Sequence, residues 1–422
     1  MASAAAPGAR EEFSAQWALV LACFVGFSFY SVMTASMSMF IKPLSDEFGW
    51  SRTLIASGVS IASLVTAVLS PFFGVVIDRF GARRLALPGL VANMAAMCLF
   101  ALVNGSGTQW LLLWGFYAVI SIATKSTIWL FAVSRAFEAG RGLALGIVLC
   151  GTAAALAITP PLAGWLIDGW GWRVAYVALA LGWGGVTLVL CWLFLRDGPQ
   201  VAKGEEPPAP VDRESLPGLT IAQAWRDGAL WRIAAITFTI MAVTMGLQIH
   251  QVEILGQAGV TRGDAAFLAS LFGVAGIVGK LVTGWLVDRY RANWIGGVTL
   301  AATALAFFLL IDGITSPALI VLAIVINGYT AGTKLQIAVY LTARYAGMKN
   351  FGAISGAMNS LTAAGTGLGP PLAGFVFDTA GNYTAFLILG VVGSLVSGLL
   401  VLTLPRYPAF EKPPEKGAEK PA

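Results

Sequence analysis

The chain has 422 residues, of which 57% are apolar and only 11% are charged, less than half the charged share of about 25% that is typical of a soluble domain. A mean hydropathy of +0.79 indicates a polypeptide surrounded mainly by lipid and excludes a water-soluble enzyme. One histidine and four dispersed cysteines offer no ligand set for a catalytic zinc ion or a metal cluster, and no cofactor is predicted. The net charge of +5 does not indicate nucleic acid binding, because no basic run with interleaved aromatics occurs outside the loops.

Apolar windows of about 20 residues, the length of a helix that crosses a hydrocarbon core of about 30 Å, recur along the whole chain. They show no period-two alternation, so they predict an all-α membrane protein with twelve transmembrane helices. The predicted spans are residues 17–41, 53–77, 85–104, 109–134, 142–167, 173–195, 231–255, 265–287, 294–312, 317–343, 352–377 and 384–404.

Basic residues are distributed unevenly between the two sides of these spans. Of the 26 Lys and Arg residues, nineteen lie on the side of the two chain ends, four lie on the opposite side, and three lie inside spans. Lys and Arg are enriched in cytoplasmic loops. We therefore expect both termini to be cytoplasmic, in a multi-pass protein of the plasma or inner membrane that acts as a monomer.

Composition also predicts the domain organisation. Residues 1–195 form one predicted six-helix bundle and residues 230–405 form the other. Residues 196–229 between them are rich in Pro and charge, which predicts a cytoplasmic linker. LTIAQAWRDGALW at 219–231, where the linker ends, carries two tryptophans in a weakly amphipathic pattern typical of a short interfacial helix. Residues 406–422 predict a disordered cytoplasmic tail.

The two halves repeat each other at a constant shift of 210 residues. GVVIDRF at 74–80 matches GWLVDRY at 284–290, and PPLAGWLIDGWG at 160–171 matches PPLAGFVFDTAG at 370–381. Ser51-Arg52 fall on Thr261-Arg262 under the same shift. Separated matches without a gap indicate a duplicated six-helix unit. Two parallel six-helix halves related by an axis along the membrane normal are the arrangement of the major facilitator transporters.

The loop between spans 2 and 3 resembles the signature loop of the major facilitator superfamily. Glycine permits close helix approach, and an aspartate beside a cationic loop can latch helix ends through charge pairs and helix dipoles. The predicted gating residues are Gly74, Asp78, Arg79, Gly81, Arg83 and Arg84, with Gly284, Asp288 and Arg289 in the second copy. The positive-inside rule alone would explain the arginines but not the glycine and aspartate spacing.

Within the superfamily, the second half resembles the monocarboxylate porter and oxalate/formate antiporter group. The resemblance rests on His250, on FLASLFGVAGIVGKLVTGWLVDRY in span 8 and on YLTARYAGMKNFGAISGAMNSL leading into span 11. In that group, an arginine four residues before the glycine of the repeated loop is thought to hold the substrate carboxylate. This chain has Lys280 before Gly284, so the resemblance implies attraction of an anion by a point charge instead of a two-pronged clamp.

Three lysines lie inside predicted spans, where each charge costs at least about 2.5 to 3.5 kcal/mol and must face protein or a water-filled path. Under the shift of 210, Lys334 falls next to Lys125. In the fold that the chain resembles, spans 1, 4, 7 and 10 line a central cavity, which implies that these two lysines face each other with Lys280 nearby. A helix-packing role for each lysine is the alternative. A polar stripe on span 10 consists of Asn327, Thr330 and Lys334.

The predicted substrate-binding residues are Lys125, Lys280, Lys334, His250 and Asn327. Histidine titrates near neutral pH, and Glu253 follows His250 by one helical turn, which predicts a proton-coupling pair. A polar pair that only shapes the outer entrance is the alternative. No acidic residue lies deep in any predicted span, so either the substrate is the missing anion or some of the lysines are neutral.

These features favour a secondary transporter of small organic anions, above all carboxylates, that works by alternating access with proton symport or anion exchange. A proton-coupled multidrug or metabolite exporter of the same superfamily is the alternative. It fits less well, because the exporter signature in span 5 is missing at Ile147, Leu156 and Pro160. A non-transporting sensor on a carrier fold is a remote alternative. The expected partners are the anion, protons and the lipid bilayer, without nucleic acid.

Overall fold

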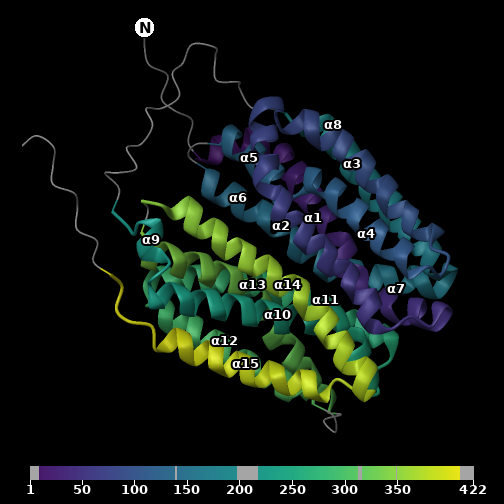
Figure 1. Ribbon diagram of the computed structural model, residues 1–422. Coiled ribbons are helices and arrows are strands. Elements are labelled where there is room, and N and C mark those ends of the chain that lie inside the picture. The colour runs from purple at the N-terminus through teal and green to yellow at the C-terminus, as the bar shows by residue number, and fades with distance from the viewer. Residues whose placement is uncertain (1–8, 138–139, 197–216, 312–315, 348, 409–422) are drawn as a thin grey trace, which may run out of the picture.

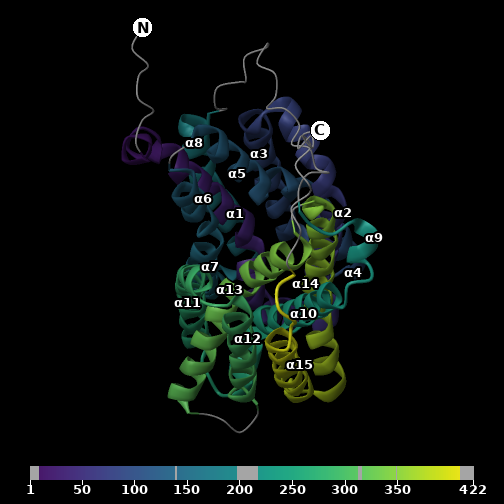
Figure 2. The ribbon, with the colours of Figure 1, turned by 90° about the vertical axis from the view of Figure 1, so that its left-hand side faces the viewer.

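The computed structural model describes residues 9–137, 140–196, 217–311, 316–347 and 349–408, without the side chains of residues 9, 70, 71, 74, 75, 78 and 288. The described chain is almost entirely helical, and its helices form two groups that lie side by side (Figure 1). The view turned by 90° shows the same division (Figure 2). The predicted all-α membrane fold is confirmed, whereas the count of twelve crossings and the exact domain boundaries stay predictions.

Among the described residues, the first half contains eight α-helices, and the second half contains seven. The helices of the first half are α1 (Ala9–Phe48), α2 (Arg52–Phe80), α3 (Ala82–Leu99), α4 (Gly107–Ser121), α5 (Ser126–Ala136), α6 (Arg141–Leu149), α7 (Gly151–Ala178) and α8 (Gly184–Phe194). The helices of the second half are α9 (Ile221–Ala224), α10 (Gly228–Gln257), α11 (Arg262–Arg289), α12 (Ala292–Phe308), α13 (Pro317–Ala346), α14 (Phe351–Ala380) and α15 (Thr384–Leu402). We call the end of the molecule where α9 lies the linker end, and the opposite end, where α1 ends and α2 begins, the far end.

In the described ranges, nine helical stretches are long and apolar enough to cross a membrane. One of them, Arg141–Phe194, has 54 residues, more than twice the roughly 20 that one crossing needs. Gly171 interrupts this stretch with φ +83°, a left-handed conformation that glycine adopts at little steric cost. The interruption lies between the predicted spans 5 and 6.

Three helix pairs join the halves in the described part of the chain: α2 packs on α14 and α7 packs on α11 most extensively, and α1 also packs on α10. The shift of 210 residues relates the first two pairs to each other, since it carries α2 onto α11 and α7 onto α14. In α14, Pro371 has no N–H to donate, which leaves the carbonyl of Gly367 without its helical partner. The hydroxyl of Ser60 on α2 donates to this carbonyl. The proline therefore creates an acceptor that links the two halves.

Close packing inside the second half depends on glycines of α14. A Cβ on Gly369 would collide with the backbone carbonyl of Ala242 on α10, whereas a Cβ on Gly352 of the same helix would meet nothing within 4 Å. We expect Gly369→Ala to destabilise the fold by about 1–3 kcal/mol, because over-packing forces backbone shifts. Gly352→Ala is the matched control. Thermal melting of both variants in detergent measures the effect, and equal melting temperatures would contradict this packing.

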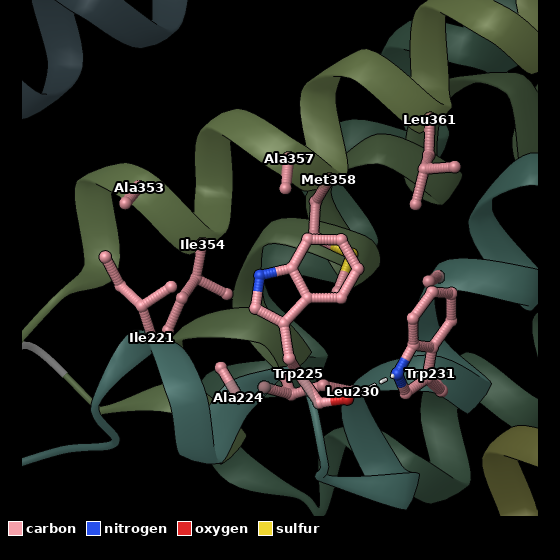
Figure 3. Close-up of a pocket in the computed structure, with 11 residues that line it drawn as sticks. Ile221, Ala224, Trp225, Leu230, Trp231, Ala353, Ile354, Ala357, Met358 and Leu361 are labelled. Atoms are coloured by element: carbon pink, nitrogen blue, oxygen red, sulfur yellow. Dashed lines mark hydrogen bonds between the residues drawn. The ribbon is translucent and has the colours of Figure 1, made fainter.

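The linker ends in a short segment that docks on the second half. The N–H of Leu219 donates to the carbonyl of Ala346 at 2.8 Å, and the amide of Asn350 donates to the carbonyl of Leu219 at 3.0 Å. The helix that follows, α9, has four residues and a capping box. Together with the first turns of α10 and α14 it lines an apolar pocket, where the ring of Trp225 lies beside Met358 (Figure 3).

Candidate functional site

A cavity of about 760 Å³ lies between the two halves, within the range of about 300–1,000 Å³ that is usual for ligand sites. Helices of both halves line it, among them α1, α2, α7, α10, α11, α13 and α14. Its wall carries many hydroxyl and amide groups, from Tyr30, Ser31, Thr34, Ser63, Thr66, Ser121, Ser126, Thr152, Gln248, Asn359, Ser360, Thr362 and Thr366. Three lysines and no carboxylate occur among the described lining residues.

Lys125 lies at a break in the predicted span 4. Helix α4 ends at Ser121, a short 3₁₀ turn covers Ile122–Thr124, and Lys125 has extended backbone angles (φ −71°, ψ 165°) before α5 begins. The predicted span 4 corresponds to one membrane-length stretch, Gly107–Ala136, and its helix is interrupted at this point. Irregular backbone at membrane depth is tolerated where it lines a cavity, and Lys125 is on the cavity wall.

Lys280 connects the two halves through its ammonium group. It extends from α11 and donates to the carbonyl of Leu149 at 3.1 Å and to the hydroxyl of Thr152 at 3.2 Å. Both acceptors flank the junction of α6 and α7, where Cys150 separates the two helices. Because these acceptors are neutral, they satisfy hydrogen bonds of the ammonium group without cancelling its charge.

Lys334 also lines the cavity, where it donates to the hydroxyl of Thr244 on α10. The rest of the predicted polar stripe faces elsewhere. The hydroxyl of Thr330 donates to the carbonyl of Ile326 on its own helix and accepts from the hydroxyl of Thr303 on α12 at 2.9 Å. Asn327 is fully buried, its amide has no hydrogen-bond partner within the described part of the chain, and it is not among the described lining residues of the cavity. Its predicted contact with substrate stays untested.

His250 is buried inside the second half and is not among the described lining residues of the cavity. Its Nε2 lies 2.9 Å from the carbonyl oxygen of Pro370, and its Nδ1 lies 2.9 Å from the hydroxyl of Tyr383. A carbonyl only accepts, so Nε2 carries the proton in this arrangement. Both ring nitrogens of His250 therefore have partners: Nε2 contacts Pro370 of α14, and Nδ1 contacts Tyr383, the residue that precedes α15.

Glu253, the other member of the predicted proton-coupling pair, has a different partner. Its carboxylate binds Arg52 of α2, with the nearest oxygen 2.7 Å from the guanidinium and with 8% of the Glu253 side chain exposed. The guanidinium of Arg52 also lies 3.7 Å from the ring centroid of Phe377 on α14. The described contacts thus place Glu253 between the halves at the far end, while His250 stays within one half. The proton-coupling role of both residues stays a prediction.

The predicted gating loop lies at the linker end. Gly81 has φ +82°, and its N–H donates to the carbonyl of Ile77 to end α2. Arg83 donates to the carbonyls of Leu195 and Trp192 at 2.7 and 2.8 Å, within its own half. Arg79, Arg84 and Arg289 are exposed, and Gly284 lies near Gln336. The predicted gating residues whose side chains fall outside the described part are Gly74, Asp78 and Asp288.

A second set of charged contacts at the far end was not among the predicted site residues. Asp378 of α14 accepts hydrogen bonds from the N–H groups of Arg52 and Thr53 at 3.0 and 2.9 Å and from the hydroxyl of Thr53 at 2.6 Å. Arg262 of α11 binds Asp168 of α7 at 2.8 Å. The sequence did contain a signal for these residues, because both aspartates lie in the repeated segments at 160–171 and 370–381, each of which begins with PPLAG.

Known proteins support this architecture. The sequence model of the Major Facilitator Superfamily matches residues 19–258 and 249–422. Monocarboxylate transporter 13 of Bos taurus is 28% identical over 345 residues, which are 80% of this chain and 77% of that protein. Monocarboxylate transporter 4 of Rattus norvegicus is 27% identical over 402 residues, which are 92% of this chain and 82% of that protein.

Among solved structures, a bacterial homologue of the human lysosomal transporter Spinster, in an inward-facing and unoccupied conformation, has a similar fold. Its TM-score is 0.64 at 17% sequence identity, and the match covers 94% of this chain and 95% of that one. At this identity the likeness concerns the fold alone. The family and the relatives are transporters and not enzymes, and the chain belongs to the major facilitator superfamily, where it resembles the monocarboxylate transporters.

Proposed function

We propose that the protein is a secondary active transporter of small organic anions, with carboxylates as the first class to test, and that the central cavity is its transport site. The observation that carries this proposal is the wall of the cavity, which presents Lys125 from one half and Lys280 and Lys334 from the other, with no carboxylate among the described lining residues. Charges at membrane depth usually mark a substrate path. The names of the relatives agree with an anionic substrate.

The placement of the lysines on both halves supports alternating access. An anion between them contacts both halves at once, and its charge offsets the cost of several cations in a medium of low dielectric. Anion exchange satisfies this charge balance, because the cavity then reorients only with an anion bound, whereas in proton symport the proton cancels the charge of the transported anion. We further propose that both termini are cytoplasmic, as the distribution of Lys and Arg predicts, so that the far end faces the outside of the cell.

A thermal-shift panel on the purified protein tests the substrate class. We expect at least one carboxylate or sulfonate to raise the melting temperature, because a ligand that binds only the folded state stabilises it by mass action. The same anion should enter proteoliposomes. A variant with glutamine at Lys125, Lys280 and Lys334 should lose both responses, whereas Lys42→Gln, which removes an exposed lysine at the far end, should keep them. Stabilisation by organic cations alone would contradict the proposal.

A further inference from the structure

The far end carries two contacts between the halves that the internal repeat makes equivalent. The shift of 210 residues carries Asp168 onto Asp378 and Arg52 onto Arg262. In the structure, Asp378 binds the first turn of α2, which begins at Arg52, and Asp168 binds Arg262 at the first turn of α11. The same two positions of the repeat therefore meet twice, once on each side of the pseudo-symmetry axis.

We propose that these two contacts, which we call the α2 clasp (Asp378 with Arg52 and Thr53, and Glu253 with Arg52) and the α11 clasp (Asp168 with Arg262), form the outer gate of the carrier. Both clasps join the first half to the second. The outer side can open only if the aspartates separate from the helix starts that they bind. The clasps hold the outer side closed in the conformation described here.

The glycine of the second repeated segment explains how Asp378 reaches its partner. Glycine and aspartate are four residues apart in both copies, so they lie on one face of the helix. A Cβ on Gly374 would lie 2.6 Å from the backbone nitrogen of Thr53, so the bare glycine lets α14 touch the start of α2. Asp378, one turn further along α14, then reaches the free N–H groups at that helix start, where a carboxylate is favoured.

The two clasps differ because the two helix starts differ. Helix α11 has an acidic residue in its first turn, Asp264, which bonds to the N-cap Thr261. The shift places Leu54 at the equivalent position of α2, and α2 has no acidic residue in its first turn. The start of α2 therefore takes its carboxylate from the other half. The α2 clasp is also better shielded, with 20% of the Arg52 side chain exposed against 30% for Arg262.

Labelling of a cysteine in the cavity from outside intact cells tests the proposal. The reporter is Ser63→Cys on the cavity wall, in a protein whose four native cysteines are replaced by serine, with a membrane-impermeant maleimide. We expect Asp378→Ala to raise the labelling rate about tenfold, since charge-assisted hydrogen bonds close the α2 clasp. Gly374→Ala should also raise it, because the added methyl separates the helices. Asp168→Ala should raise it less.

Matched controls at the same end separate gating from general loosening. Asp46→Asn breaks a contact within α1, with Lys42, and Gly169→Ala adds a methyl that meets nothing within 4 Å. Neither should change the rate. A second reporter, Asn104→Cys in the loop after η1 (Phe100–Leu102), measures surface abundance and orientation in every variant. The double variant Arg262→Asp/Asp168→Arg exchanges the two charges of the α11 clasp. Its labelling rate should be closer to that of the parent than the rate of Asp168→Ala.

Two results would overturn the proposal. The first is labelling of the Ser63→Cys reporter at the parental rate in the double variant Asp168→Ala/Asp378→Ala, with the Asn104→Cys reporter labelled normally. The second is an equal rise in the two control variants. If Asp378→Ala does not reach the membrane, Asp378→Asn, which keeps the shape and removes the charge, takes its place under the same criteria. The measurement needs no substrate, so its outcome is independent of whether the cavity carries anions.

Discussion

Replacement of Lys280 by alanine is expected to lower anion uptake about 30-fold or more, with unchanged abundance in the membrane. The alanine variant lacks the cation that we propose pairs with the bound anion. Removal of one partner of a buried, hydrogen-bonded charge pair costs at least about 2 kcal/mol, which corresponds to that factor. The ammonium of Lys280 also joins α11 to Leu149 and Thr152 of the other half, so the alanine variant loses a contact between the halves. Initial uptake into proteoliposomes, normalised to reconstituted protein, measures the effect.

Two further variants separate the charge of Lys280 from its contact. Lys280→Arg keeps the charge and should retain part of the uptake, although a planar guanidinium replaces a point charge. Thr152→Val removes one acceptor of the ammonium group but leaves the charge, and it should change uptake much less than the alanine variant does. Uptake at the parental rate in Lys280→Ala would remove this residue from the anion site.

The second large effect is expected from Lys125 and Lys334 together. Both line the same cavity from opposite halves, and no carboxylate occurs among its described lining residues. Moving several cations through a region of low dielectric when the empty carrier reorients costs several kcal/mol for each charge. A bound anion offsets that cost. Unlabelled substrate outside the proteoliposomes should therefore accelerate the efflux of labelled substrate from inside severalfold, an effect called trans-stimulation.

A double-mutant cycle tests whether the two lysines act on one ligand. Neutralisation of both should weaken this trans-stimulation more than the single changes predict, because groups that share a ligand are not additive. Equal efflux with and without trans substrate in the parent protein would refute the expected acceleration by substrate on the opposite side. Additive single effects would show that the lysines act separately, and Lys280 would then remain as the anion site.

Sequence features predicted the class of this protein because a lipid solvent leaves few structural choices. Long apolar runs at membrane depth must satisfy their own backbone hydrogen bonds, which makes helices the outcome. The shift of 210 residues predicted two related halves, and the structure shows related helix pairs, α2 with α14 and α7 with α11, at their junction. Lysines are costly in such helices, and the resemblance to the major facilitator fold implied that Lys125 and Lys334 line a central cavity, where the structure has them.

The sequence could not decide which polar residues share a partner. His250 and Glu253 are one helical turn apart, yet one bonds within the second half and the other reaches Arg52 of the first. Periodicity placed Asn327, Thr330 and Lys334 on one stripe, but a stripe on a helix is wide enough to face both a neighbouring helix and a cavity. The break before Lys125 also has no signal of proline or glycine beside it.

By itself, the sequence determined the helical membrane fold, because burial in lipid constrains the backbone locally. It also determined the two related halves, because they repeat at a constant shift, and the presence of three lysines within the predicted spans. Only the tertiary structure decided that Asp378 binds the start of α2 and that Asp168 binds Arg262. These residues are more than 90 positions apart along the chain, and their meeting depends on how closely α14 approaches α2 and α7 approaches α11. A contact of that kind follows from the packing of the two halves and not from any local pattern.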